Sequence, residues 1–216
     1  LCTDTRYGLG RWLEESNIDK WSLYEIAKYC DGVDTAGDFV GVDAGYTKWV
    51  GSPWSSTSTG SGIMEARFAC NLYLQGAQEA YKVINDIASI FRGMIYWQQG
   101  QISATQDAPS EPTMLFGDAN VLEGGFSYEG SSRKVRHNVA HVSWSNPYDF
   151  FQQHVEYVED SEAIAANNNQ IFAKNILAVG STYQGQAHRE GRWLLYTEKL
   201  ETEVVVFQTG LEGASV

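Results

Sequence analysis

Carboxyl and imidazole side chains gather in residues 131–160 of this 216-residue chain. Among them are Glu156, Glu159, Asp160, His137 and His141. A general acid needs a carboxyl group whose pKa is shifted by burial or by a neighbouring like charge. Histidines two residues apart on a strand share one face, as zinc ligands can. These residue types could therefore support acid–base catalysis or metal binding.

The spacing of these groups favours structural roles. No third ligand stands at a fixed short spacing from His137 and His141, and the sequence has no HExxH-type signature. It also has no P-loop, no GxSxG motif and no dinucleotide-binding fingerprint. We therefore predict no catalytic, metal-binding or cofactor-binding residue and no cofactor.

The segment that would position these groups is predicted to form two strands joined at a breaker. Apolar residues fall on both faces of the alternating pattern in residues 135–144, which is typical of a strand covered on both sides. Asn146-Pro147 interrupts the pattern, because proline lacks the N–H that a sheet ladder needs, and residues 152–158 resume it. Basic residues at 133–136 precede the pair, and acidic residues follow it.

The other elements are predicted from periodicity and from turn residues. Helices are expected at residues 20–30 after an Asp19 N-cap, at 77–91, briefly after Ser161, and from a capping box at Ser181 and Gln184 to about Glu201. A hairpin of residues 94–98 and 101–106 is expected across Gln99-Gly100. Further strands are expected at residues 65–73, 114–116, 121–122, 126–128 and 202–207.

These elements predict an α+β chain of two units. Residues 107–112 hold two prolines among small and acidic residues, which indicates a boundary. The first unit, residues 1–112, would contain two helices, a hairpin and a long Gly/Ser loop at 32–62. The second, residues 113–216, would be a strand-rich, barrel-like domain closed by a helix and a strand.

Composition excludes several function classes. A net charge of −12 argues against a nucleic-acid-binding surface, since phosphate neutralisation needs clustered Lys and Arg. No apolar run approaches the ~18–20 residues of a membrane span, and no signal-peptide pattern begins the chain. Three cysteines without CxxC spacing favour reduced, structural thiols. Because the chain opens on Leu1 and ends in a small polar tail, we expect a piece of a longer polypeptide.

Two tryptophans in the long loop leave other functions open. Trp49 and Trp54 lie among glycines, serines and threonines, where exposed indole rings could bind sugars or could fold back on the core. A carbohydrate-binding module is therefore the alternative hypothesis. A cell-wall glycosidase is a third one, and it would need two carboxyl groups ~5–9.5 Å apart.

Short segments along nearly the whole chain carry a family resemblance. Among them are Asp19-Lys20-Trp21, Arg67-Phe68 with Cys70-Asn71, Phe91-Arg92-Gly93-Met94, Arg136-His137-Asn138, Val158-Glu159-Asp160, Gly185-Gln186-Ala187-His188-Arg189 and Gly191-Arg192-Trp193-Leu194-Leu195. In order and approximate spacing they resemble the central region of the tip attachment (host specificity) protein J family of lambda-like tailed phages and prophages. Residues 37–62 form a longer loop than is usual in that family, and Ala166-Asn167-Asn168 replaces its common Arg-Tyr-Gly. These departures concern surface details, including contacts to neighbouring proteins, and not the resemblance itself.

The resemblance implies a structural role at the tail tip of the virion, assembled in the host cytoplasm. It implies a baseplate-hub-like fold in which a trimer surrounds the end of the tail tube, contacts neighbouring tail-tip and tail-tube proteins, and supports host recognition and DNA delivery. It implies no enzyme activity. In this family receptor recognition belongs to the C-terminal part of the protein, which we expect this chain not to reach.

Overall fold

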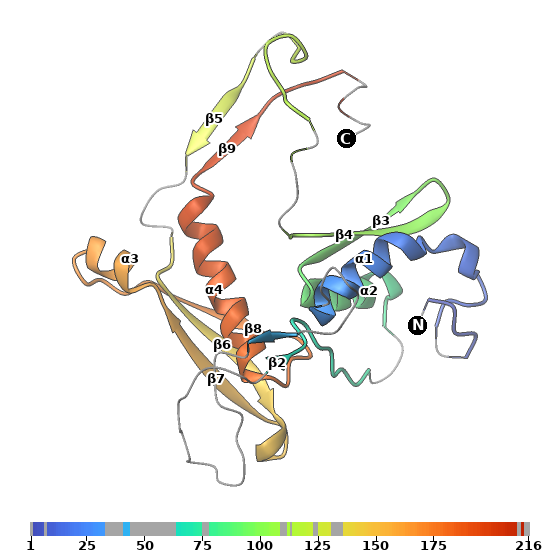
Figure 1. Ribbon diagram of the computed structural model, residues 1–216, viewed down its shortest axis with the longest axis horizontal. Coiled ribbons are helices and arrows are strands. Elements are labelled where there is room, and N and C mark those ends of the chain that lie inside the picture. Colours follow the sequence, from blue (N-terminus) through green and yellow to red (C-terminus); the bar gives the residue numbers. More distant parts are fainter. Residues whose placement is uncertain are drawn as a thin grey trace. The chain divides into compact units, whose positions relative to one another are not determined.

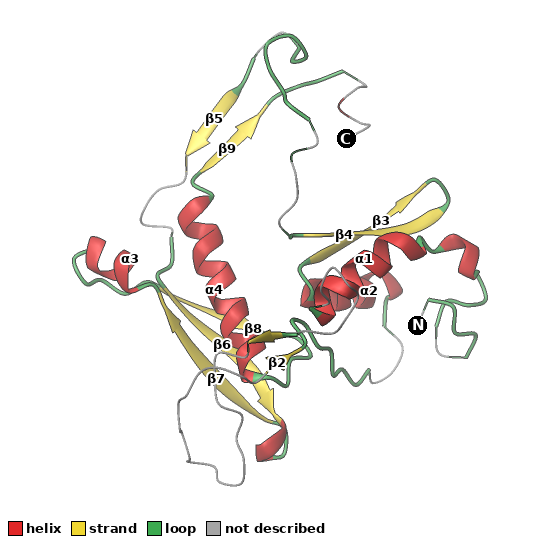
Figure 2. Ribbon diagram, in the orientation of Figure 1, coloured by secondary structure: helices red, strands yellow, loops and turns green. Residues whose placement is uncertain are grey.

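A computed structural model of the chain describes residues 2–6, 8–32, 41–43, 64–74, 78–108, 112, 114–122, 125–130, 136–210 and 213. It contains helices and small sheets, which confirms the α+β class (Figures 1 and 2). Trp49 and Trp54 lie outside the described residues, so the carbohydrate-binding hypothesis stays a prediction. No helix in the described part is long and apolar enough to cross a membrane.

The chain divides into two compact units. Unit 1 consists of Leu1–Asp107, Val142–Glu156 and Ile176–Glu190, and unit 2 consists of Ala108–His141, Tyr157–Asn175 and Gly191–Val216. Several long elements contribute residues to both units. The boundary at residues 107–112 stays a prediction.

Helix α1 of unit 1 spans Lys20–Asp31 and follows the short 3-10 helix η1 (Glu15–Asn17). The Asp19 carboxylate accepts hydrogen bonds from the N–H groups of Trp21 and Ser22 at 3.1 and 3.3 Å, as the predicted N-cap requires. The helix ends at Gly32, where φ is +70° and the glycine N–H bonds the last carbonyls. The predicted helix and its cap are therefore confirmed.

Helix α2 (Ala80–Ile90) leads into a hairpin of β3 (Gly93–Gln98) and β4 (Gln101–Gln106). The strands are antiparallel, and Gln99 and Gly100 both have positive φ, as a two-residue hairpin loop requires. The residues before α1 bond the hairpin, with the Asp19 N–H donating to the Ile102 carbonyl at 3.0 Å. The predicted helix and hairpin are confirmed.

The strand predicted at residues 65–73 is wrong. Only Met64–Glu65 (β2) is a strand, and it pairs with β1 (Val42–Asp43). Beyond it, the Ala69 N–H donates to the Gln186 side chain and the Asn71 N–H donates to the Gly180 carbonyl. The sequence of this segment alternates as a strand would. Its hydrogen bonds, however, go to the Gln186 side chain and the Gly180 carbonyl and not to a neighbouring strand.

Cysteine thiols are free in unit 1, at Cys2, Cys30 and Cys70. Burial raises the pKa of Cys30 to about 11, so this thiol is protonated at neutral pH and unreactive. Cys70 is exposed and closes no strand, which corrects its predicted position. The three free thiols are thus consistent with the prediction of reduced cysteines. Cys30 is the cysteine whose pKa is most affected by burial.

The predicted strand pair of residues 131–160 is confirmed as β6 (Val139–Asn146) and β7 (Gln152–Glu159). With β8 (Ala173–Leu177) they form a sheet in the order β7-β6-β8, so β6 is the central strand. On β6, Val139, Ala140 and Val142 are fully buried. Residues 131–135 of the predicted first strand lie outside the described residues.

The breaker between these strands is the 3-10 helix η3 (Pro147–Asp149), and two phenylalanines follow it in an unusual conformation. Phe150 and Phe151 have φ of +51° and +59°. Side chains other than glycine pay about 1–2 kcal/mol per residue in this left-handed region. The connection therefore stores backbone strain.

Helices α3 (Ser161–Ala166) and α4 (Gln184–Leu200) occur where the sequence predicted helices, but their caps differ from the prediction. The N-cap of α3 is Asp160, whose carboxylate accepts from the Ala163 N–H, and not Ser161. The Ser181 hydroxyl donates to the Tyr183 carbonyl, and α4 begins at Gln184, three residues after Ser181, so Ser181 does not occupy the N-cap position of this helix. A serine or glutamine side chain has several partners within reach, and the sequence does not say which one it bonds.

The last strand pair of unit 2 is β5 (Ser127–Gly130) with β9 (Glu203–Val206), in antiparallel register. The strand predicted at 202–207 is confirmed, whereas the one at 126–128 is displaced to Ser127–Gly130. Residues 121–122 contribute only an isolated bridge from Val121 to Thr209, and residues 114–116 are not a strand. Short apolar runs beside glycines were therefore poor guides to pairing.

Candidate functional site

Glu156, the first carboxyl group considered for catalysis, has a structural environment in unit 1. Its side chain is buried, with the residue 8% exposed. One carboxylate oxygen accepts from the Gln184 amide at 3.0 Å, and the other lies 3.0 Å from His188 Nδ1. Because Gln184 and His188 stand one turn apart on α4, Glu156 ties the beginning of that helix to β7.

The remaining acid and imidazole groups lie in unit 2, each with its own partner. Glu159 accepts from the Tyr157 hydroxyl, Asp160 pairs with Lys199, His137 pairs with Glu198, and His141 contacts Asn175. Among the described residues, no group of three or more His, Cys, Asp or Glu could hold a metal ion. The absence of catalytic and binding residues remains a prediction. The contacts given above are of the kind that stabilise a fold.

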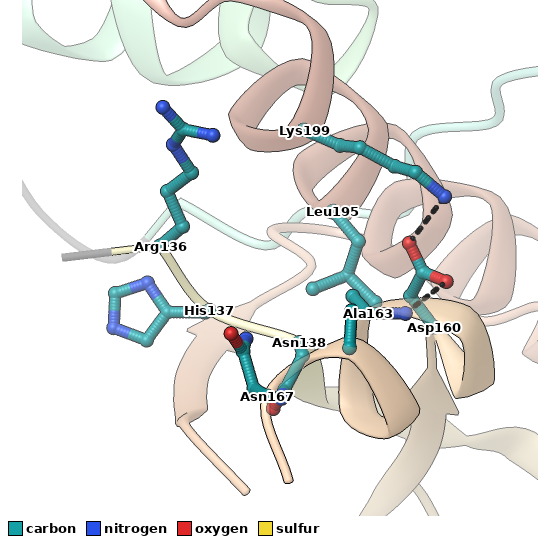
Figure 3. A pocket seen from close by; sticks show the side chains of 9 residues that line it. Arg136, His137, Asn138, Asp160, Ala163, Asn167, Leu195 and Lys199 are labelled. Carbon is teal, nitrogen blue, oxygen red and sulfur yellow. Dashed lines mark hydrogen bonds and ion pairs between the residues drawn. The ribbon is translucent and has the colours of Figure 1, made fainter. Parts of the chain in front are cut away.

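A pocket of about 210 Å³ lies in unit 2 (Figure 3). Its lining consists of Arg136, His137, Asn138, Asp160, Ala163, Ala166, Asn167, Leu195 and Lys199. Lys199 Nζ lies 2.9 Å from the Asp160 carboxylate and 3.1 Å from that of Glu162. In Figure 3, Arg136 and Lys199 lie to either side of Leu195. The pocket lining thus combines apolar and charged residues.

Two carboxyl groups in and beside this pocket have lowered pKa values. Burial acts to raise the pKa of Asp160, but the hydrogen bonds from Lys199 and from the Ala163 N–H outweigh it. Burial likewise acts to raise the pKa of Glu198, and the bonds from His137 and Lys174 outweigh it. Both groups are therefore held ionised in the folded chain.

We expect acid to destabilise unit 2 through these groups. A carboxyl group whose folded pKa is lowered contributes stability above its unfolded pKa of about 4, and this contribution is lost as the pH falls through the folded value. Hydrogen exchange of α3 amides between pH 6 and pH 3 measures the loss. Asp160→Asn keeps an acceptor for the Ala163 N–H but has no charge, so it should reduce the pH dependence. An unchanged dependence in this variant would contradict the assignment to Asp160.

Arg189 of unit 1 joins α4 to the segment after β2. Its guanidinium lies 2.8 Å from Glu65 Oε1 and donates to the carbonyls of Ala66 and Arg67 at 3.4 and 3.1 Å. The Arg189 and Glu65 side chains are 22% and 12% exposed. One arginine thus contacts three consecutive residues, namely the last residue of β2 and the two residues that follow it. We call this set of contacts the arginine clamp.

A second arginine extends these contacts within unit 1. Arg92 donates to the Arg189 carbonyl at 3.2 Å, lies over the Phe68 ring, and pairs with Glu190 at 3.5 Å. Burial raises the pKa of Glu190 and lowers the pKa of Arg92, and each charge opposes the shift of the other. Burial therefore opposes the electrostatic attraction between Arg92 and Glu190. The packing of the Arg92 guanidinium on the Phe68 ring is the clearer contribution to the stability of unit 1.

Sequence patterns alone did not predict the arginine clamp. Its members carry no catalytic spacing, and Glu65 and Arg189 are far apart along the chain. The only signal was the set of matching segments, because Arg67-Phe68 and Gly185-Gln186-Ala187-His188-Arg189 supply Arg67 and Arg189, whereas Glu65 and Ala66 lie in none of them. Part of the resemblance thus falls on residues that make contacts within unit 1.

Comparison with known proteins defines the class. A family model described as a putative phage tail protein matches residues 79–216, so the chain belongs to this family of phage tail proteins. The chain is also 36% identical over 216 residues to the tip attachment protein J of Escherichia phage SECphi27. It is 28% identical over 214 residues to the tip attachment protein J of Escherichia phage SECphi4. The matches cover 99% of this chain and 16% of each relative's length. The resemblance to the protein J family is confirmed.

Proposed function

We propose that this chain is a structural segment of a tail-tip hub protein with a baseplate-hub-like fold. The hub forms the distal end of the tail tube and supports host recognition and DNA delivery. The observation that carries this proposal is the match to the tip attachment protein J of phage SECphi27, which is 36% identical and extends over 99% of the chain. A match along the whole chain favours a shared structural role over a grafted site.

The exposed apolar surface supports a role in assembly. Tyr128 on β5 and Val204, Val205 and Val206 on β9 are exposed, although these strands form only a two-stranded ribbon. Such a ribbon is marginally stable alone, and clustered apolar side chains mark contact surfaces. Neighbouring tail-tip and tail-tube proteins, or further domains of the same polypeptide, would bury it.

The number of chains that associate in solution tests this proposal. The isolated chain is expected to be monomeric, because a ring needs contacts shared among several domains and because a charge of −12 makes copies repel. Restoring the flanking hub domains is expected to produce a trimer. Light scattering on both proteins decides between the outcomes. A longer polypeptide that stays monomeric would contradict the ring, and a trimer of the isolated chain would contradict the shared interface.

We further propose that the chain is not an enzyme. Alanine at Glu156 removes the acceptor for Gln184 and His188 and is expected to cost about 1–3 kcal/mol of unfolding free energy, measured by urea denaturation. Replacement of Glu159 or Asp160 with alanine should likewise change stability or assembly. It should not change the rate of any enzymatic reaction. Cleavage of cell-wall glycan that depends on any of these carboxylates would overturn this prediction.

The predicted boundary is testable by limited proteolysis. If residues 107–112 link two units, a protease should cut there, or within residues 37–62, before it cuts elsewhere, because such linkers make few contacts. Mass spectrometry of the first fragments identifies the sites. First cleavage inside α2, whose Val83 and Ala88 are buried, would count against the boundary.

A further inference from the structure

The turn between β6 and β7 exposes aromatic rings. Tyr148, Phe150 and Phe151, which we call the aromatic tip, are 60%, 92% and 64% exposed. All three belong to unit 1. These three side chains leave most of their surface unburied within the chain, and aromatic side chains are enriched in protein interfaces.

The aromatic tip is held in one conformation. The buried Asn146 accepts a hydrogen bond from the Tyr148 N–H on its side chain and one from the Phe151 N–H on its carbonyl, at 3.0 and 2.8 Å. Asp149 pairs with His154 at 2.9 Å, and His154 packs on Trp144. Left-handed backbone at two phenylalanines persists because these contacts fix it, and strain of this kind concentrates where a protein meets its ligand. The tip is therefore preorganised for binding.

The unit 2 pocket has the properties of a receptor for such a ring. Its volume of about 210 Å³ exceeds the 150 Å³ or so of an apolar cavity known to bind benzene. Ala163, Ala166 and Leu195 contribute apolar atoms to the lining. Arg136 and Lys199 contribute cations, and Lys199 is paired with the Asp160 carboxylate, which also lines the pocket.

Charge favours the same pairing. Arg136 ends the chain's one basic cluster, residues 133–136. Asp149, in the same turn as the aromatic tip, has a partly exposed carboxylate that is paired with His154. Because copies with a net charge of −12 repel one another, contacts that bring opposite charges together are favoured.

We propose that the aromatic tip of one copy of this chain docks into the unit 2 pocket of a second copy. A closed ring requires that every copy carry both halves of the contact, and the tip and the pocket meet this requirement. A single tip buries little area, so the contact is weak between isolated chains and becomes effective when further hub domains hold the copies together. The inference rests on the proposed trimeric hub.

Photo-crosslinking in the longer hub polypeptide tests this docking directly. A photoreactive phenylalanine analogue is placed at position 150, and heavy-isotope and unlabelled copies are mixed so that contacts between copies are distinguished from those within one. The expected crosslinks join position 150 of one copy to residues 136–138 or 163–167 of another. Crosslinks within one copy, to another tail protein or to a different surface would overturn the proposal, as would the absence of crosslinks in an assembled trimer.

Matched variants separate this inference from the proposed function. Phe150→Asn removes the ring and tolerates positive φ, so the isolated chain should fold at least as stably as before. In the longer polypeptide it should weaken trimerisation about tenfold or more. Tyr81→Asn, at another exposed aromatic residue of unit 1, is the control and should leave trimerisation unchanged. Normal trimerisation of Phe150→Asn would refute the docking and leave the hub intact. A parent polypeptide that forms no trimer would refute both.

Discussion

Replacing Arg189 with methionine is expected to lower the unfolding free energy by about 3 kcal/mol, the lower end of the cost of removing one partner of a buried ion pair, because both side chains are partly buried. The variant leaves the Glu65 carboxylate without its cation, and that side chain is only 12% exposed. It also removes the donor that serves the carbonyls of Ala66 and Arg67. Chemical denaturation followed by circular dichroism measures the change.

Arg192 provides the matched control, since it stands on the same helix but is exposed. Its guanidinium contacts only the Tyr196 ring and hydroxyl among the partners that the structure describes. Arg192→Met should therefore cost less than about 1 kcal/mol. Glu65→Gln combined with Arg189→Met should recover part of the loss, because no charge is then left buried. Equal effects of the two arginine variants would contradict the arginine clamp.

Alanine at Asn138 is the second substitution with a large expected effect. Asn138 is 1% exposed, and its side chain accepts from the Phe172 N–H and donates to the Gln170 carbonyl, both at 2.7 Å. Truncation leaves these two backbone groups without their partner, at about 1–3 kcal/mol each. We therefore expect a loss of about 2–5 kcal/mol in unfolding free energy, by the same measurement.

Asn175→Ala is the control for that variant. Asn175 also lies in unit 2, but it is exposed and contacts the ring of His141. Its replacement should change the unfolding free energy by less than about 0.5 kcal/mol, as at ordinary surface positions. Hydrogen exchange should also show faster exchange at Phe172 in Asn138→Ala alone. Unchanged protection there would disprove the assigned role of Asn138.

Local rules predicted those elements whose partners are near in sequence. Asp19 caps the helix that follows it, and Gln99-Gly100 turns a hairpin between adjacent strands. The rules failed where distant residues decide. Residues 66–74 alternate like a strand, but their hydrogen bonds go partly to Gly180, Thr182 and Gln186, which lie more than a hundred residues away. No local pattern specifies such partners.

The same limit applied to the functional residues. The sequence drew attention to Glu156 as a carboxylate, but its structural role depends on Gln184 and His188, 28 and 32 residues further on. The aromatic tip carried a turn signal at Asn146-Pro147, yet nothing in the sequence showed that Phe150 would be exposed and left-handed. Exposure of an aromatic residue is a property of the fold, because the apolar type alone predicts burial.

The central claim is that this chain is part of the tail tip. Immunogold electron microscopy of intact particles of the encoding phage, with antibodies raised against the 216-residue chain, tests it most directly. Particles produced without the gene provide the control for specific labelling. The account predicts gold at the distal end of the tail and nowhere else on the particle. Label along the tail shaft or on the capsid would contradict it, as would specific binding that is confined to material outside the particle.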